Sequence, residues 1–361
     1  MHDADRIARL RLIRSERIGP ITYFQLLSRF GSAEAALAAL PDLARRGGGK
    51  APRIASLADA EREIAAVAKA GAKQLFLGVP PYPNLLAELE DAPPVITFKG
   101  HISLLNKPTV AIVGARNASA AAVRFARTLA AGLADAGLVV VSGLARGIDG
   151  AAHQGALQGG TIAVIAGGID SIYPPEHAEL QERIASEGLL IAEQPPGVEP
   201  QARHFPRRNR IIAGLSLGVV VVEAAPKSGS LITARLALEQ GRDVMAVPGS
   251  PIDPRAQGCN QLIRDGAILV QSAADVVDTV KPFGQRDLWS PAPPFQARAI
   301  AADASDAERH TVEALLGPSP VPVDEIIRLS ALTPAIVHTV LLELELGGRL
   351  ERHAGGRVSV G

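Results

Sequence analysis

Six short apolar runs between residues 110 and 247 constrain the fold of this chain more than any other feature. Polar and apolar residues do not alternate inside these runs, so both faces of each strand are expected to be covered. Helix-length stretches separate the runs, which is the rhythm of a doubly wound parallel α/β sheet. The runs are Val110–Val113, Leu138–Val141, Ile162–Ile165, Leu189–Ile191, Val219–Val222 and Val244–Val247.

The first 78 residues are expected to be helical. Apolar residues recur at a helical period before Ile18–Pro20 and again before Gly31–Ser32, where the chain turns. A helix, a short turn and a second helix form small DNA-contact modules, and they also form ordinary helical bundles. The Gly47–Gly49 stretch is interpreted as a flexible loop. Pro80–Pro83 and Pro93–Pro94 mark a stiff connection into the next domain.

The C-terminal part is expected to be a winged helix-turn-helix domain. Residues 283–305 are rich in Pro and Ala and form a linker that should isolate this domain. Three predicted helices follow, the last at Thr333–Leu346, and then a hairpin at Arg349–Val360. The predicted division is therefore 1–78 helical, 79–282 α/β core, 283–305 linker and 306–361 winged helix.

Composition limits the compartment and the kind of site. The single cysteine, Cys259, excludes an internal disulfide and a cysteine-based zinc site, and it is expected to be a buried inert thiol. The N-terminus has neither the apolar run of a signal peptide nor a membrane span, so a cytoplasmic protein without a membrane partner is expected. Net charge is zero, although residues 1–78 carry 13 Lys and Arg against 8 Asp and Glu, and residues 306–361 carry 5 against 8. A polyanion partner would therefore need a local basic patch.

Gly- and Ser-rich loops follow five of the predicted strands. Glycine allows close backbone approach, and the next helix presents N–H groups to an anion, so these loops predict a phosphate site at one edge of the sheet. The alternative is that strand-to-helix turns need glycine for their own geometry. The loops contain Gly114–Arg116, Ser142–Gly143, Gly167–Gly168, Ser228–Ser230 and Pro248–Ser250.

Familiar nucleotide and catalytic motifs do not fit these loops. Gly114-Ala115-Arg116 is not the G-x-G-x-x-G of dinucleotide enzymes, no acidic residue follows Ser142–Gly143, and no Walker lysine motif occurs. Asp149 and His153 could pair across one helix turn, but a helix-start carboxylate beside a satisfied histidine is the favoured interpretation. No catalytic residue, cofactor or metal is expected.

The most informative stretch runs from Arg203 to Arg210. Four arginines and a histidine surround Phe205, a composition that suits phosphate contacts and one stacked base. A solvated basic face is the alternative, although Phe205-Pro206 and the apolar pair that follows the stretch disfavour it. Arg210 is expected to have a structural role, pairing with a carboxylate under the sheet.

These residues resemble the signature blocks of the DprA family, also called Smf, in order over about 170 residues. The resemblance implies an extended Rossmann-like core that binds single-stranded DNA, with an N-terminal helical SAM-like domain and a C-terminal winged helix. It also implies a homodimer that helps to load RecA recombinase during natural transformation. The matching blocks are Val113–Arg116, Val141–Asp149, Tyr173-Pro174, Phe205–Ser216 and Ser228–Ala234.

The resemblance and the basic stretch together give a set of DNA-binding candidates. The chain departs from the family pattern at Ala115, where a serine is usual, and near Ala202 and Arg203, where a lysine often precedes the Phe-Pro pair. The candidates are Gly114, Arg116, Gly143, Arg203, Phe205, Arg207, Arg208, Asn209, Ser228, Gly229 and Ser230.

Two other functions remain open. A phosphoribohydrolase-like or nucleotide-sensing protein would use the same crevice, and Glu223 and Glu239 are available, but the Ser228–Thr233 loop lacks the Pro-Gly-Gly-x-Gly-Thr pattern of those enzymes. A sequence-specific regulator would use Thr333–Leu346 as a recognition helix. That segment carries Glu343 and Glu345 and no Lys or Arg, which disfavours groove reading and favours a protein-contact role.

Overall fold

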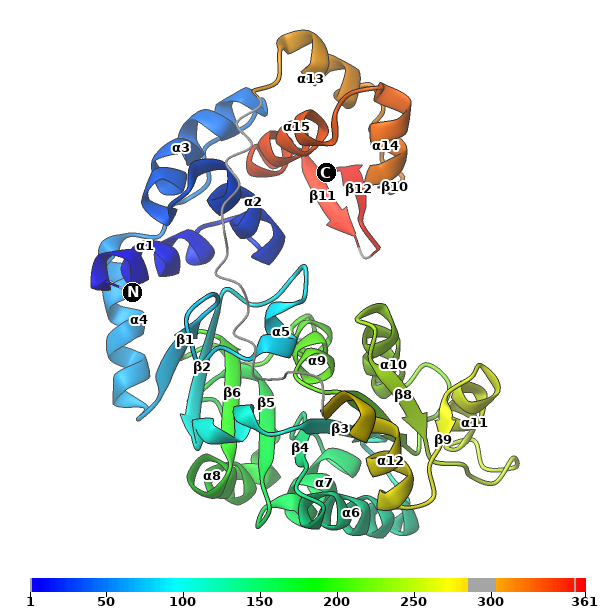
Figure 1. Cartoon of the computed structure of the whole chain (residues 1–361). Coiled ribbons are helices and arrows are strands. Elements are labelled where there is room, and N and C mark those ends of the chain that lie inside the picture. The colour runs from blue at the N-terminus through cyan, green and yellow to red at the C-terminus, as the bar shows by residue number, and fades with distance from the viewer. Residues whose placement is uncertain (1, 285–302, 354) are drawn as a thin grey trace. The chain divides into compact units, whose positions relative to one another are not determined.

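Each of the six apolar runs forms a strand of one nine-stranded sheet. A computed structural model describes residues 2–284, 303–353 and 355–361, in two compact units formed by residues 63–293 and by residues 1–62 with 294–361. In the first unit, the core unit, the strand order is β1-β2-β6-β5-β4-β3-β7-β8-β9 (Figure 1). The strands are β1 Lys73–Phe76, β2 Val95–Gly100, β3 Thr109–Gly114, β4 Val139–Ser142, β5 Thr161–Gly168, β6 Leu189–Gln194, β7 Gly218–Val222, β8 Asp243–Ala246 and β9 Ile268–Leu269.

Strands β3 to β9 pair in parallel, which confirms the doubly wound prediction. Three strands were not predicted. β2 pairs antiparallel with β6, β1 pairs antiparallel with β2, and the two-residue β9 pairs parallel with β8. From β3 the chain winds outward to β6, then returns to place β7 on the other side of β3. The sheet therefore changes winding direction between β3 and β7, and ligands of open parallel sheets bind at that point.

Helices cover both faces of the sheet because alternate residues of each buried strand point to opposite sides. Val110 and Ile112 of β3 pack towards one face, and Ala111 and Val113 pack towards the other. The first face is covered by α6 Ala120–Asp135, α7 Ile148–Ala156, α8 Ala178–Glu187 and α12 Ala273–Gly284. The second is covered by α5 Asn84–Ala87, α9 His204–Gly214, α10 Gly229–Glu239 and α11 Gln257–Arg264.

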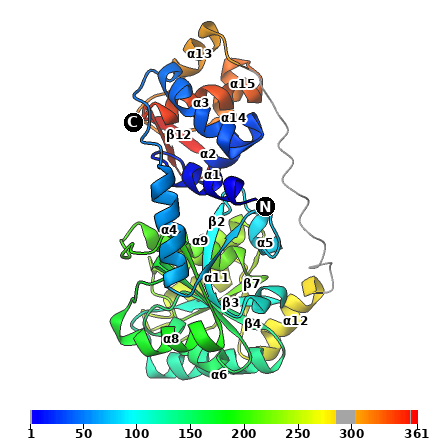
Figure 2. The ribbon, with the colours of Figure 1, turned by 90° about the vertical axis from the view of Figure 1, so that its left-hand side faces the viewer.

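The second unit, the terminal unit, combines both ends of the chain. The predicted helices and hairpin are present, and the hairpin joins a three-stranded sheet of order β10-β12-β11. In Figures 1 and 2, α15 lies beside α3. The elements are α1 Asp3–Arg14, α2 Pro20–Phe30, α3 Ala33–Arg46, α13 Asp306–Glu313, β10 Val321–Pro322, α14 Val323–Ser330, α15 Pro334–Leu346, β11 Leu350–His353 and β12 Arg357–Val360, with α4 Leu57–Lys69 leading into the core unit.

The expected isolation of the C-terminal domain is wrong, because that domain shares an apolar core with the N-terminal helices. The division at residues 78, 282 and 305 stays a prediction, and residues 285–302 of the predicted linker lie outside the described residues. Among the residues that are described, no helix is both long and apolar enough to cross a membrane.

Cys259 on α11 is fully buried against the sheet, as expected. Burial raises the pKa of its thiol to about 11. At pH 8 roughly one thiol in a thousand would then be ionised, and the thiolate is the form that reacts with electrophiles.

We therefore expect Cys259 to escape alkylation in the folded protein at pH 8 and to react fully in denaturant. The chain has one cysteine, so mass spectrometry of the alkylated protein reports this site alone. Complete labelling of the folded protein within minutes would contradict the buried position of the thiol.

Candidate nucleic-acid interface

The five Gly- and Ser-rich loops gather at one edge because the strands that precede them are parallel and end there. The loops after β3 and β7 flank the point where the winding direction changes. Gly114 ends β3, and a Cβ at this position would overlap the Val222 carbonyl of β7. Gly114 thus allows the two strand ends to approach each other, which is a packing role at the rim of the candidate site.

Arg116 projects from this rim and stacks on Phe205. Its guanidinium carbon lies 5.1 Å from the centre of the Phe205 ring, within the range of a cation–π interaction. Tyr173 contacts the same ring in an edge-type geometry, with ring centres 5.5 Å apart and an interplanar angle of 60°. Arg116 is exposed and Tyr173 is 46% exposed, so a cation and an aromatic face are open to solvent side by side. We call Arg116, Phe205 and Tyr173 the surface stack.

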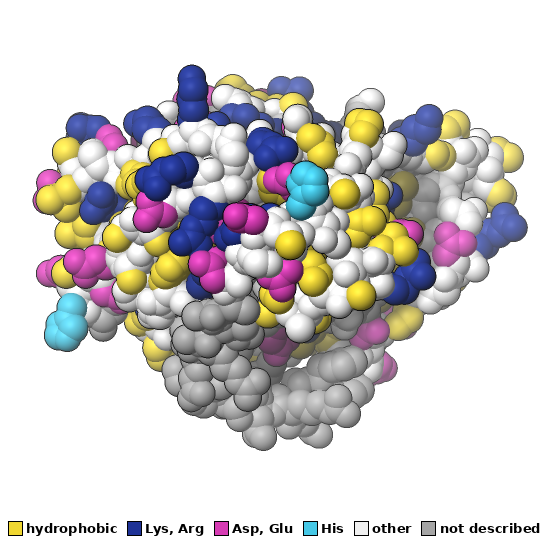
Figure 3. Space-filling model, turned by 90° about the horizontal axis from the view of Figure 1, so that it is seen from above, with side chains coloured by type: hydrophobic (Ala, Val, Ile, Leu, Met, Phe, Trp, Pro, Cys, Tyr) yellow, Lys and Arg dark blue, Asp and Glu magenta, His cyan; other side chains and the backbone are white. Residues whose placement is uncertain are grey.

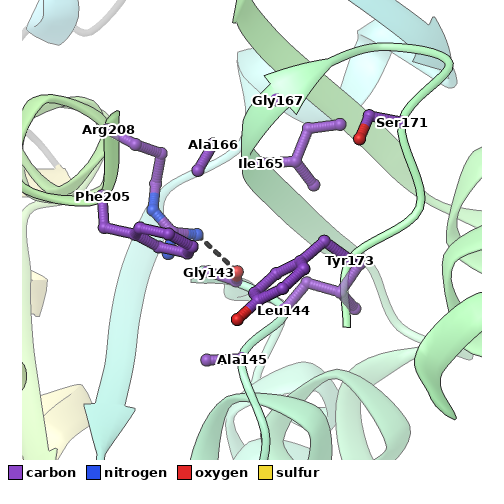
Figure 4. Close-up of a pocket in the computed structure, with 10 residues that line it drawn as sticks. All are labelled: Gly143, Leu144, Ala145, Ile165, Ala166, Gly167, Ser171, Tyr173, Phe205 and Arg208. Carbon is purple, nitrogen blue, oxygen red and sulfur yellow. Dashed lines mark hydrogen bonds between the residues drawn. The ribbon is translucent and has the colours of Figure 1, made fainter. Parts of the chain in front are cut away.

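Tyr173 was not among the sequence candidates, although it lies in one of the matching blocks. Its exposure could not be read from the sequence, because Tyr173-Pro174 has the composition of an ordinary turn. The structure places it in a loop between β5 and α8, opposite Phe205 at the start of α9 (Figure 4).

Beneath the surface stack, Arg208 lies buried. Its guanidinium donates a hydrogen bond to the backbone carbonyl of Gly143, directly after β4 (Figure 4), and another to that of Val164, in the middle of β5. Only 6% of the residue is exposed, and the Phe205 ring lies over the guanidinium at 6.0 Å. Burial lowers the pKa of Arg208 to about 10, so it remains charged at neutral pH. The side chain fastens α9 to the sheet, and its buried Nε has no hydrogen-bond partner among the described residues.

Both backbone polar groups of Gly143, its N–H and its carbonyl, form internal hydrogen bonds. Its N–H donates to Asp149 at 3.2 Å, and its carbonyl accepts from Arg208. A Cβ on Gly143 would overlap the Arg208 guanidinium, so a larger residue here would displace that buried group. Burial raises the pKa of Asp149, against the opposing charge of Arg208. The Gly143 N–H is therefore engaged in an internal hydrogen bond, and a DNA-binding role of Gly143 stays a prediction.

Asp149 and His153 do not hydrogen-bond to each other in the structure. His153 Nδ1 lies 2.7 Å from the Thr161 hydroxyl, and burial lowers the pKa of His153 to about 3. Asp149 accepts from Gly143 and from the Ala145 N–H at 3.3 Å. Asp149 is thus a carboxylate in the first turn of α7, as the favoured interpretation has it, but His153 is only partly satisfied. Its Nδ1 contacts Thr161, and its buried Nε2 has no hydrogen-bond partner among the described residues.

The arginines between residues 203 and 210 divide into exposed and buried side chains, because successive residues of a helix face different sides. The stretch forms the N-cap, Arg203, and the first turns of α9. Arg203 and Arg207 are exposed and form no ion pair with any described residue. Arg210 is 7% exposed and pairs with Glu193 and Asp91, as its expected structural role requires. Asn209 is half-buried, and its amide lies 3.5 Å from the Gly229 carbonyl.

The Ser228–Ser230 loop adds hydroxyls and a cation to the same edge. Ser228 caps α10, and its hydroxyl lies 2.8 Å from that of Ser230. Gly229 is exposed, and the space where its Cβ would lie is open. Lys227 is exposed at the loop start with a backbone φ of 67°, a left-handed conformation that sequence reasoning did not indicate.

Neither of the available glutamates is a free catalytic base. Glu223 accepts hydrogen bonds from the Ser119 N–H and hydroxyl and pairs with Arg255 at 3.2 Å. Glu239 pairs with Arg235 on the exposed side of α10. The hollow lined by Gly143, Tyr173, Phe205 and Arg208 has a volume of about 10 Å³, room for one water. Within the described ranges, no group of three or more His, Cys, Asp or Glu side chains is placed to hold a metal.

The fold and the carboxyl edge of the core sheet define an α/β protein of two units, with an arginine and aromatic rings exposed at that edge. Three family models match it in order: "DprA-like N-terminal HHH domain" at residues 3–66, "DNA recombination-mediator protein A" at 73–281 and "DprA winged helix domain" at 296–356. The chain belongs to the DprA family of DNA-processing proteins.

Individual relatives agree with this assignment. The DNA processing protein DprA of Streptococcus pneumoniae is 50% identical over 198 residues, 54% of this chain and 70% of that protein. Protein Smf of Escherichia coli is 42% identical over 282 residues, 77% and 74% of the two chains.

Two solved DprA structures show the same fold. The Streptococcus pneumoniae structure has a TM-score of 0.65 and 37% identity, covering 78% of this chain and 99% of that one. The Helicobacter pylori structure, described in terms of its single-stranded DNA binding mode, has a TM-score of 0.54 and 31% identity, covering 59% and 97%.

Arg207 and Arg208 are adjacent arginines with opposite environments, which permits a matched test. We expect Arg208→Ala to lower the free energy of unfolding of the core unit by about 3 kcal/mol, because two buried carbonyls lose their donor and a buried carboxylate loses its countercharge. Arg207→Ala removes the same charge from the same helix and should change it by less than about 0.5 kcal/mol. Denaturant unfolding followed by circular dichroism measures both, and equal effects would contradict the assigned environments.

Proposed function

We propose that the chain binds single-stranded DNA along the carboxyl edge of the core sheet, with little sequence preference. The surface stack carries the proposal. It offers a guanidinium for a phosphate and an aromatic face for a base, and these two groups are in contact with each other. Exposed Arg203, Arg207 and Lys227 supply further positive charge around it. The Helicobacter pylori relative, whose description names single-stranded DNA binding, supports the ligand class.

The geometry of the stack favours single strands over duplexes. Phe205 and Tyr173 can stack only on a base whose face is free, and in a duplex the neighbouring base pairs cover both faces. The arginines and lysine contact phosphates without reading base edges, so they contribute affinity but little sequence discrimination.

The DNA-binding candidates from the sequence then divide into residues that contact DNA and residues that position them. Arg116, Arg203, Phe205, Arg207 and the Ser228–Ser230 loop are proposed to touch DNA, and Tyr173 and Lys227 join them. Gly114, Gly143 and Arg208 are proposed to position these groups, because their atoms are used in internal packing and hydrogen bonds. Asn209, directed to Gly229, is proposed to hold the loop beside α9.

A binding protein is proposed in preference to an enzyme. Glu223 and Glu239 are occupied by internal partners, and the hollow at the edge is far smaller than a nucleotide. Nucleotides would therefore lie across the surface, which suits a strand better than a hydrolysed monophosphate.

In the cell, we propose that the protein acts in the cytoplasm as a homodimer that protects incoming single strands and helps to load RecA during natural transformation. The family description as a recombination mediator supports this role. Exposed Ile268 and Leu269 on edge strand β9 support self-association, because an apolar edge strand is a ready surface for pairing.

Binding to single strands should exceed binding to duplexes of the same sequence and length. Affinity should fall steeply with salt, because each phosphate contact releases counterions, with a slope of roughly 0.7 per contact on a single strand. Fluorescence anisotropy with labelled poly-dT and duplex oligonucleotides across salt concentrations measures both properties. Equal or tighter duplex binding would overturn the proposal.

Arg116→Ala should weaken single-strand binding by about 1.5–3 kcal/mol, the range for a hydrogen bond to a charged group, and Arg116→Lys should restore part of the loss. Lys73→Ala is the control, since it removes an exposed cation at the opposite edge, where β1 begins. Unchanged affinity in Arg116→Ala, with a lowered melting temperature, would show that this arginine stabilises the fold and does not bind phosphate.

A further inference from the structure

Helix α15 of the winged-helix domain is buried on almost every side. Of the 13 residues of α15, Pro334–Leu346, only Pro334 and His338 are exposed. Val337, Val340, Leu341 and Leu344 pack into the core of the winged-helix domain itself. A helix that reads a DNA groove needs a second, solvent-facing side that carries hydrogen-bonding groups.

That second side of α15 instead belongs to the core of the N-terminal helices. Leu342 and Leu346, each 2% exposed or less, cluster with Leu12, Leu40 and Leu43. A helix with apolar residues all round is typical of burial between two layers. The two leucines therefore complete an apolar core whose other members lie some 300 residues earlier in the chain.

The Gly47–Gly49 stretch fits against the end of α15 through backbone atoms. A Cβ on Gly47 would overlap the Glu343 carbonyl, and a Cβ on Gly49 would overlap the Gly347 carbonyl. The interpretation of this stretch as a flexible loop is wrong, since its glycines are needed for close approach. Arg349 lies across the same contact, 3.4 Å from the Gly47 carbonyl.

Hydrogen bonds and ion pairs surround the shared core. Several of them join arginines of the N-terminal segment, which has an excess of positive charge, to acceptors of the C-terminal segment, which has an excess of negative charge. Arg17, in the turn between α1 and α2, donates to the Leu346 carbonyl at 2.9 Å. Thr22 donates to Glu345 at 2.9 Å, and Arg46 pairs with Asp303 at 2.6 Å. Glu343 is 1% exposed and is held by Arg309 of α13 at 2.8 Å, which neutralises the buried carboxylate.

We propose that α15 is an internal docking helix that joins the N-terminal and winged-helix domains into one cooperative folding unit and is thereby withdrawn from DNA reading. The chain then has its core unit inserted between the two halves of a single terminal unit. This inference concerns the terminal unit alone and does not depend on single-strand binding by the core.

The test is hydrogen exchange, followed by mass spectrometry, of the full chain and two variants. Leu346→Glu places a charge in the shared core, and Gly47→Ala adds a Cβ where the Glu343 carbonyl lies without changing α15. Both should speed amide exchange at least tenfold in α2 and α3 and also in α15. Amides of β3, β4 and β7, in the core unit, should keep their wild-type exchange.

Matched controls separate docking from general damage. Leu329→Glu makes the same change at a 53% exposed leucine of α14, and Gly19→Ala adds a Cβ where no atom lies within 4 Å. Neither should alter exchange outside its own helix.

Two results would overturn the proposal. One is faster exchange in α13–α15 of both variants with α1–α3 unchanged, which would show two domains that open independently. The other is protection of α15 amides in the wild-type chain when a duplex oligonucleotide is added, which would show that the helix contacts DNA.

Discussion

The buried guanidinium of Arg208 is the interaction on which the candidate interface depends. It joins α9 to the end of β4 and the middle of β5 through two backbone carbonyls. α9 carries Phe205 and the exposed Arg207, and the exposed Arg203 is its N-cap. A buried cation is costly unless hydrogen-bond acceptors and a countercharge surround it. Here two backbone carbonyls accept hydrogen bonds from the guanidinium, and the carboxylate of Asp149 lies nearby as the countercharge. The cation thereby fixes α9 at one position, with Phe205 over the guanidinium at the surface.

Much of the fold could be predicted because buried parallel strands have a strong local signal. Val219–Val222, for example, can satisfy both of its faces only between two layers of helices. The antiparallel strands β1 and β2 were missed because Lys73–Phe76 and Val95–Gly100 are half polar and lie among prolines. Their pairing depends on the exposed edge of β6, which is a property of the assembled sheet.

The site was predictable in composition but not in the role of each residue. Arg203, Arg207, Arg208 and Arg210 look alike in sequence, and only the register of α9 determines which of them face solvent. The same limit applies to the terminal unit. Leu342 and Leu346 have the pattern of an apolar helix, but which surface they cover follows from a partner about 300 residues away. Long-range pairing of this kind leaves no local periodicity in either segment.

The most direct test of the account is photocrosslinking of the wild-type chain to poly-dT that carries 5-iodouracil, followed by peptide mapping. A halogenated base crosslinks to an aromatic ring on which it stacks. The account expects crosslinks at Phe205 or Tyr173, abolished by excess unlabelled single strand. Crosslinks confined to the terminal unit, with none on the peptides that contain Tyr173 and Phe205, would contradict it.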